Sequence, residues 1–125
     1  MKASLPFLCM ASLAAILSSA PPAAAAETGA VITLNDAFRF APASVTIRAG
    51  EAAEWRNASH FPHIVTDDPK LGDAAIPAGA EIFSSGEIPP GGSFRRVLSV
   101  SGHYRYFCIP HEGIGMVGDI TVLPR

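Results

Sequence analysis

Short runs rich in β-branched and aromatic residues, separated by glycine and proline, fill residues 30–123 and most constrain the fold. No segment in this region repeats its apolar residues with a helical period, and residues 89–92 (Pro-Pro-Gly-Gly) form a clear turn. Strands are predicted at residues 30–34, 38–40, 45–47, 51–57, 64–66, 94–100, 104–108 and 117–123, with a loop over 67–86. The pattern predicts one all-β domain, an antiparallel β-sandwich of about seven to eight strands.

Alternation along these strands predicts which side chains point into the core. The predicted core residues are Val31, Leu34, Phe40, Val45, Ile47, Trp55, Val65, Phe94, Leu98, Tyr104, Tyr106, Ile120 and Val122. The sequence contains no internal repeat, and 125 residues are enough for one domain at most.

The first 26 residues have the features of a secretory signal peptide. Lys2 gives a positive start, residues 5–17 form an apolar run, and residues 24–26 (Ala-Ala-Ala) match a small-x-small cleavage pattern. We predict cleavage before Glu27, which leaves residues 27–125 as the mature domain in the periplasm or otherwise outside the cell. An uncleaved anchor is the alternative, but the apolar run is shorter than the ~20 residues of a spanning helix.

Sulfur is scarce in residues 27–125. Cys9, Met1 and Met10 fall within the predicted signal peptide, so the mature domain keeps Cys108 and Met116 alone. A single cysteine cannot form an internal disulfide, and an exported protein must bury it, pair it with another chain, or use it.

Cys108 and Met116 enclose a histidine in the segment Cys-Ile-Pro-His-Glu-Gly-Ile-Gly-Met, which contains His111. Fully extended, its eight steps would span about 26–29 Å, so a shared metal requires the chain to fold around one point. Gly113 and Gly115 permit such a turn, and Pro110 stiffens its start. Thiolate, imidazole and a weak thioether ligand are typical of blue-copper sites, whereas zinc seldom accepts thioether sulfur.

A second histidine has to come from another part of the chain. His103 lies on the strand before Cys108 and is predicted to point away from the loop. His63 opens a short strand directly after Pro62, whereas His60 lies in the preceding turn. Because a strand end orients a ring better than a turn does, we prefer His63 as the ligand, and the role of His60 stays open.

Residues 104–118 resemble the copper loop of plastocyanin, and Phe61-Pro62-His63 resembles the upstream ligand motif of the same family. The C-x2-H-x4-M spacing is similar to that of plastocyanin and pseudoazurin. The resemblance implies a cupredoxin-type Greek-key sandwich with one type 1 copper ion held by His63, Cys108, His111 and Met116. It also implies single-electron transfer through Cu(I)/Cu(II) to redox proteins that dock transiently near His111.

The resemblance carries expectations about the surroundings of the copper ligands as well. The backbone N–H of Ile64 is expected to donate to the cysteine sulfur, whereas Pro110 has no N–H to offer. Phe107 occupies the position of an outward aromatic that plastocyanin uses as a second electron route. The position after His63 is commonly asparagine in that family and is Ile64 here, and the position after Cys108 is Ile109 instead of serine or threonine.

Other functions remain as alternatives. The formal net charge of −2 and the scattered basic residues exclude a basic surface for nucleic acid, and no membrane span is expected once the signal peptide is cleaved. The protein is predicted to be a monomer and not an enzyme. A copper-delivery protein would use the same ligands but release the metal. An enzyme using Cys108 and His111 as a nucleophile–base pair would leave Met116 without a role.

Overall fold

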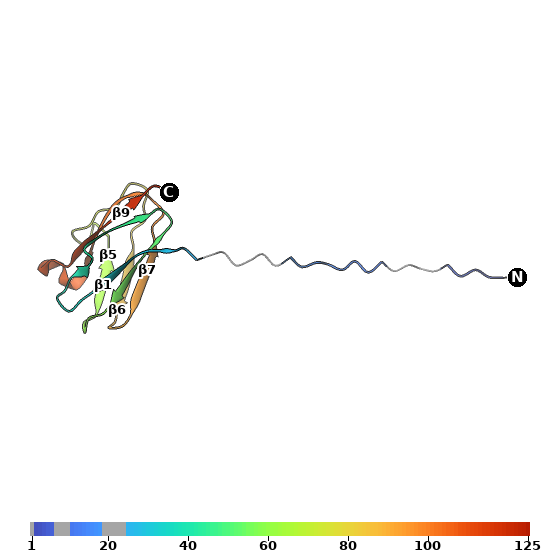
Figure 1. The fold of residues 1–125 in the computed structure, drawn as a ribbon, viewed down its shortest axis with the longest axis horizontal. Coiled ribbons are helices and arrows are strands. Elements are labelled where there is room, and N and C mark those ends of the chain that lie inside the picture. Colours follow the sequence, from blue (N-terminus) through green and yellow to red (C-terminus); the bar gives the residue numbers. More distant parts are fainter. Residues whose placement is uncertain (1, 7–10, 19–24) are drawn as a thin grey trace.

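The computed structural model of this chain describes residues 2–6, 11–18 and 25–125 (Figure 1). Residues 2–6 and 11–18 form no helix or strand and lie on a trace that leads away from the folded body. Cys9, Met10 and residues 19–24 of the predicted signal peptide lie outside the described residues. Within the described part of the chain, no helix has the length and apolar character needed to cross a membrane.

Two β-sheets form the folded body. The first has the order β2-β1-β4-β7 and is built from β2 (Phe40–Ala41), β1 (Thr28–Leu34), β4 (Ala52–Asn57) and β7 (Ser93–Val97). The second has the order β3-β9-β8-β5-β6 and is built from β3 (Ser44–Arg48), β9 (Val117–Leu123), β8 (Gly102–Cys108), β5 (His63–Thr66) and β6 (Ser84–Ile88). The predicted all-β sandwich is therefore confirmed.

Both sheets are mixed, which differs from the purely antiparallel arrangement that we expected. β1 pairs in parallel with β4, and β3 pairs in parallel with β9. The reason lies in the connections. After β1 the chain forms β2 in the same sheet and β3 in the other sheet, and it then returns as β4, which lies beside β1 in the same direction. Parallel neighbours need such a long crossover, whereas a hairpin would give antiparallel ones.

The space between the sheets holds an aromatic cluster around Trp55. Its ring lies 5.3 Å from Phe83, 5.5 Å from Phe94 and 5.3 Å from Tyr106, measured between centroids. Ten of the predicted core residues are buried, namely Leu34, Phe40, Ile47, Trp55, Val65, Leu98, Tyr104, Tyr106, Ile120 and Val122. Val45 and Phe94 are partly buried against this core.

Val31 was wrongly predicted as a core residue, because it is 38% exposed and its neighbour Ile32 is fully buried. A shift of one residue along a strand exchanges the two faces of the sheet, and local alternation does not define which face is inner.

β6 is the strand that the sequence did not predict. Its sequence Ser-Ser-Gly-Glu-Ile has little apolar alternation, so it was included in the loop over residues 67–86. Pairing with β5 forms it, with His63 opposite Ile88 and Ile64 opposite Glu87. β5 therefore lies between β6 and β8, which places His63 inside the sheet and not at its edge.

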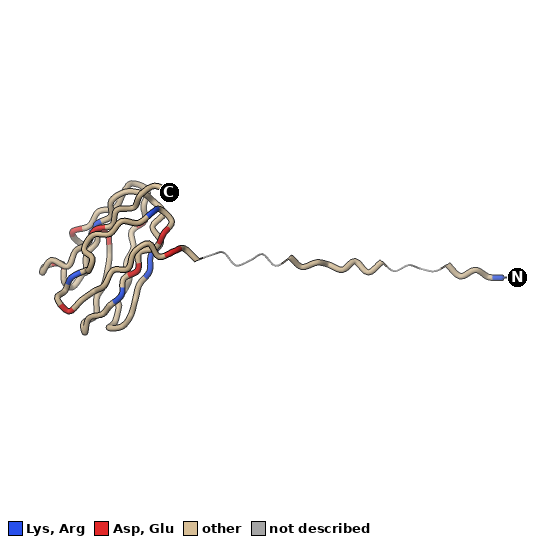
Figure 2. Tube along the Cα trace, in the orientation of Figure 1, with Lys and Arg blue, Asp and Glu red and all other residues tan. Residues whose placement is uncertain are grey.

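Charged residues are distributed over the folded body without a large region of one sign. Figure 2 shows Lys and Arg interspersed with Asp and Glu along the trace. Arg105 illustrates the pattern, since its guanidinium bonds Asp73 at 2.8 and 2.9 Å and Asp119 at 3.3 Å. These pairs connect the long loop before β6 to the outer face of β8 and β9.

Candidate metal centre

The loop after β8 folds back on itself. A short 3₁₀ helix, η1 (Ile109–Ile114), begins directly after Cys108 with Pro110 in its first turn. It ends at Gly115, whose φ of 89° lies in the left-handed region that favours glycine. The Cys108 N–H donates to the Met116 carbonyl at 3.0 Å, and the Met116 N–H donates to the His111 carbonyl at 3.2 Å. The predicted compact turn is present, and Gly115 makes it.

His63 reaches this loop through strand pairing. It is the first residue of β5, and Val65 of the same strand lies opposite Cys108 of β8. The ladder thus brings together two residues that are 45 positions apart in the sequence. His63 and Cys108 are both fully buried, and His111 on η1 is partly buried.

Three donor atoms converge at this place. Cys108 Sγ lies 3.6 Å from His63 Nδ1 and 3.3 Å from His111 Nδ1, and the two Nδ1 atoms are 3.2 Å apart. The point equidistant from them lies about 2 Å from each, close to metal–ligand bonds of about 2.0 Å to nitrogen and 2.3 Å to sulfur. The spacing fits one metal ion held by all three atoms.

The donor chemistry also fits copper. Met116 is fully buried and is hydrogen-bonded through its backbone to both Cys108 and His111, so the loop places this residue beside the other donors. Two imidazoles, one thiolate and a weak thioether form the ligand set of blue-copper sites. Among the described residues, the group of histidines, cysteines and acids close enough to bind one metal is His63, Cys108 and His111.

Burial controls the protonation of these groups. It lowers the pKa of His63, with a smaller contribution from neighbouring His111, and it lowers the pKa of His111. Both rings are therefore neutral at pH 7 and present lone pairs. Burial also raises the pKa of the Cys108 thiol, while the backbone N–H groups of Ile64 and His111 oppose this effect. A bound cation compensates for the buried thiolate charge.

The two N–H donors bear on the expected hydrogen bonding of the sulfur. The N–H of Ile64, which was expected to favour the thiolate, lowers the pKa of Cys108. Pro110 has no N–H, but the N–H of the next residue in the loop lowers the same pKa, an effect that we did not anticipate.

An apolar surface surrounds the exposed edge of His111. Phe61, Ile109 and Ile114 are 43%, 42% and 54% exposed. Phe38 packs on the His111 ring with centroids 4.5 Å apart and on Phe61 at 4.9 Å. We call Phe38, Phe61, Ile109 and Ile114 the apolar rim.

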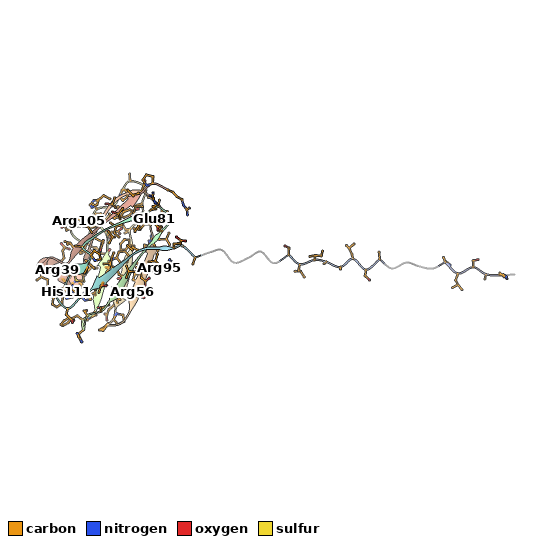
Figure 3. The ribbon with its side chains drawn as sticks, in the orientation of Figure 1. Arg39, Arg56, Glu81, Arg95, Arg105 and His111 are labelled. Atoms are coloured by element: carbon orange, nitrogen blue, oxygen red, sulfur yellow. The ribbon has the colours of Figure 1, made fainter. Side chains whose placement is uncertain are left out.

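Phe38 was not identified as part of the site because its alternation with Phe40 suggested a strand. It lies instead in a turn with φ of 57°, a conformation uncommon outside glycine. Asn35 stabilises this turn, since its Oδ1 accepts the N–H groups of Ala37 and Arg39 at 3.0 and 3.1 Å. Arg39 also donates to the Ile114 carbonyl at 2.8 Å and so connects the turn to the metal-binding loop at the His111 end of the molecule (Figure 3).

Phe107 differs from its expected position as an outward aromatic. It is 1% exposed, and Gly72 of the long loop lies over its ring, so that a Cβ at Gly72 would meet Phe107 Cζ at 2.7 Å. Glu112 lies beside the same glycine. Phe107 therefore offers no exposed aromatic ring to a docking partner.

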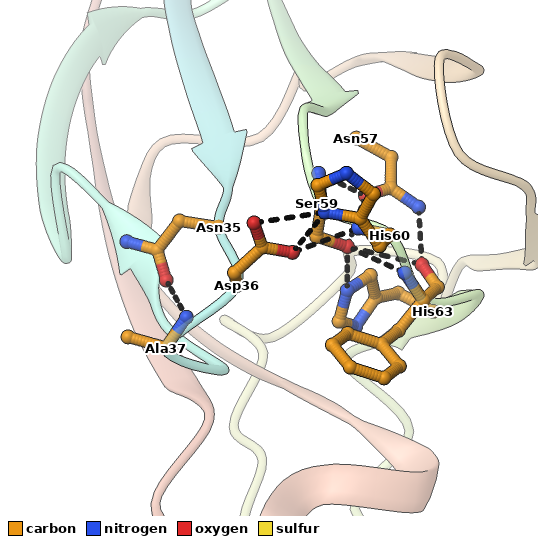
Figure 4. Close-up of polar contacts among 8 residues, drawn as sticks. Asn35, Asp36, Ala37, Asn57, Ser59, His60 and His63 are labelled. Carbon is orange, nitrogen blue, oxygen red and sulfur yellow. Dashed lines mark hydrogen bonds and ion pairs between the residues drawn. The ribbon is translucent and has the colours of Figure 1, made fainter.

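The remaining histidines lie apart from the cluster. His103 is exposed and pairs with Asp119 at 2.8 Å. His60 is 86% exposed, and Asp36 accepts from both its backbone N–H and its ring Nδ1, at 2.8 and 3.0 Å (Figure 4). The structure brings His63, and neither His60 nor His103, to Cys108 and His111.

Fold and site together define a β-sandwich with a buried site whose donor atoms are those of the blue-copper class. A family model described as copper binding proteins, plastocyanin/azurin family, matches residues 26–123. The chain belongs to this family and is a plastocyanin-like blue copper protein, with one copper ion as its cofactor.

Individual relatives agree with this assignment. The chain is 40% identical over 101 residues to plastocyanin of Scenedesmus fuscus, covering 78% of this chain and 92% of the relative. It is 37% identical over 115 residues to the chloroplastic plastocyanin of Tetradesmus obliquus, covering 89% and 72%. Among solved structures, oxidised plastocyanin from Dryopteris crassirhizoma superposes with a TM-score of 0.60 at 26% identity, covering 74% of this chain and 99% of that one.

Proposed function

We propose that this protein carries single electrons between redox proteins, with one type 1 copper ion held by His63, Cys108, His111 and Met116. The convergence of the Cys108 sulfur and the two Nδ1 atoms within 3.6 Å of one another carries the proposal. When bound, copper supplies the chemistry by cycling between Cu(I) and Cu(II). Relatives named plastocyanin support the same assignment.

The protein's own contribution is to hold the donor atoms in place. His63, Cys108 and Met116 have no exposed surface, and they lie on a sheet and on a loop closed by backbone hydrogen bonds. A rigid, water-excluding site needs little rearrangement when the charge at its centre changes, which favours fast electron exchange. The same burial leaves Cys108 inaccessible to a substrate, which argues against its use as a nucleophile.

Partners are proposed to dock on the apolar rim around His111. This ring is the ligand closest to solvent, and the exposed apolar side chains around it are typical of an interaction surface. A small apolar surface suits weak, short-lived complexes, which a shuttle requires. The protein is proposed to act as a monomer.

We also propose that residues 1–26 are a signal peptide and that the mature domain, residues 27–125, works in the periplasm or otherwise outside the cell. The first strand begins at Thr28, directly after the proposed cleavage position. Leu5, Leu13 and Leu17 of the preceding segment are 88–95% exposed, so they take no part in the core. Mass spectrometry of the exported protein should find Glu27 at its N-terminus.

The ligand assignment is tested by two matched substitutions in one short segment, at His63 on β5 and at His60 in the turn before it. The purified copper-loaded protein should absorb strongly near ~600 nm and undergo reversible one-electron reduction. His63→Ala should lose this absorption, whereas His60→Ala should keep it, because His60 is exposed and bonded to Asp36. Loss of the band in His60→Ala alone would overturn the assignment. A colourless protein that releases Cu(I) readily would support copper delivery instead of electron transfer.

A further inference from the structure

A chain of buried hydrogen bonds leads from the end of β4 to the ring of His63. It starts at Asn57, the last residue of β4, which is 2% exposed. The Asn57 Nδ2 donates to the carbonyls of Phe61 and Ile88 at 2.7 and 2.9 Å. Because both partners are acceptors, they define which end of the amide is the nitrogen. Asn57 Oδ1 is thereby free to accept.

Ser59 is the next member of the chain and is 4% exposed. Its backbone N–H and its Oγ lie 3.0 and 2.6 Å from Asn57 Oδ1, and its Oγ lies 3.0 Å from the Phe61 carbonyl (Figure 4). Both oxygens carry no proton. The single hydroxyl proton of Ser59 is therefore donated to one of them, and the Oγ has only lone pairs left for any further partner.

The Phe61 N–H donates to this Oγ at 3.2 Å, and the remaining partner is His63, whose Nε2 lies 2.8 Å from it. A hydroxyl oxygen that can only accept requires a proton on the Nε2 of His63. In a neutral imidazole the proton on Nε2 leaves Nδ1 with a lone pair. Nδ1 is the atom that faces Cys108 Sγ at 3.6 Å and His111 Nδ1 at 3.2 Å.

We propose that Ser59, oriented by Asn57, is a positioning residue that selects the Nε2–H tautomer of His63 and presents its Nδ1 lone pair before copper arrives. This inference rests on the proposed function of His63 as a copper ligand. Partners that bond the outer nitrogen of a metal-binding histidine are known to determine its tautomer and orientation. The hydrogen bonds that select the tautomer are made within the protein, so the ring of His63 is oriented before the metal binds.

The two histidines are held differently. Among the described residues, no hydrogen bond reaches the Nε2 of His111, and that ring is held by packing on Phe38. Ser59 therefore acts on the buried ligand alone. Its removal should affect His63 and leave the His111 ring packed as before.

The first test is the tautomer of His63 in the copper-free full-length chain, measured by long-range ¹H–¹⁵N NMR correlation of the imidazole ring. We expect the Nε2–H tautomer alone in the wild-type protein. A ring protonated on Nδ1 would overturn the proposal without any variant being made. This result is independent of the ~600 nm band, so failure of the inference and failure of the proposed function can be told apart.

The second test compares Ser59→Ala with Ser85→Ala. The control also removes a serine hydroxyl that is hydrogen-bonded to β5, because Ser85 Oγ accepts the Val65 N–H at 2.9 Å. This hydroxyl makes no hydrogen bond to His63 in the described structure. Ser59→Ala should give a mixture of His63 tautomers and bind copper about 10–100-fold more weakly, as for other partners of metal-bound histidines. Ser85→Ala should keep one tautomer and wild-type affinity.

Ser59→Thr retains the hydroxyl and should restore the single tautomer. If Ser59→Ala folds with the Nε2–H tautomer and unchanged copper affinity, the proposal is wrong. If Ser59→Ala does not fold, the wild-type tautomer together with Ser59→Thr decides: Nε2–H in both supports the proposal, and Nδ1–H in either overturns it.

Discussion

Asp67 is a buried carboxylate that should make the protein less stable as the pH rises. It has no exposed surface, and its Oδ1 accepts the Phe83 N–H at 2.7 Å while its Oδ2 has no partner in the described structure. Burial raises the pKa of Asp67 from 3.8 to about 6, although the N–H of Phe83 and the charge of Arg96 oppose the rise. The folded protein therefore binds this proton more tightly than the unfolded chain does.

The sign and the size of the effect follow from this difference. Well below pH 3.8, the ordinary pKa of this group, the carboxyl is protonated in both states and costs nothing. Between about pH 4 and pH 6 the unfolded chain ionises first, so the free energy of unfolding falls, and above that range the full cost remains. A rise in pKa from 3.8 to about 6 corresponds to about 3 kcal/mol of lost stability at pH 7.

Asp67→Asn removes the titration and keeps an oxygen that can accept from Phe83. We expect the variant to gain stability relative to the wild type as the pH rises, by about 0.5 kcal/mol up to pH 4 and by as much as about 3 kcal/mol up to pH 7. Urea unfolding of both proteins, in the same copper state, measures the difference. The other titratable groups are the same in both proteins, so their contribution cancels in the difference between the two free energies of unfolding.

Asp36→Asn provides a control of opposite sign. The backbone and side-chain hydrogen bonds from His60 lower the pKa of Asp36, so this carboxylate stabilises the fold once it is ionised. Asp36→Asn should lose stability relative to the wild type as the pH rises towards 3.8, the ordinary pKa of the group, and the difference should level off above that pH. A difference between Asp67→Asn and the wild type that stays constant from pH 4 to pH 7 would refute the reasoning.

Two further substitutions, each with a control, probe the strand that follows the metal-binding loop and a hydrogen bond to the loop itself. Gly118→Ala places a Cβ against the buried ring of Tyr106 and should lower the free energy of unfolding by about 1–3 kcal/mol, measured by thermal or urea unfolding. The control is Gly113→Ala, where a Cβ meets nothing within 4 Å, and it should be nearly neutral. Equal effects of the two substitutions would contradict the packing of Gly118 on Tyr106. Arg39→Ala removes the 2.8 Å hydrogen bond to the Ile114 carbonyl. It should lower the free energy of unfolding by about 1 kcal/mol and speed the loss of copper to a chelator, with Arg56→Ala as the control. An unchanged rate of copper loss would show that the loop does not need this hydrogen bond.

The sequence predicted the elements whose information is local. The spacing of Cys108, His111 and Met116 requires a compact loop, and η1 with Gly115 provides it. Alternating apolar residues predicted most strands and ten core residues, because a strand repeats its environment every second position. β6 was missed since Ser-Ser-Gly-Glu-Ile carries little of that signal, and its pairing with β5 forms it.

Residue spacing was enough to predict that a thiolate, an imidazole and a thioether meet in one loop of a β-sandwich, because chain geometry over eight steps leaves few other arrangements. The histidine that joins them became clear from the fold, since the β5–β8 ladder connects residues 45 positions apart. The tertiary structure alone shows the Asn57–Ser59 chain behind His63, the ring of Phe38 on His111, and the burial of Asp67 and Phe107. Each of these depends on contacts between distant segments, which neither spacing nor alternation encodes.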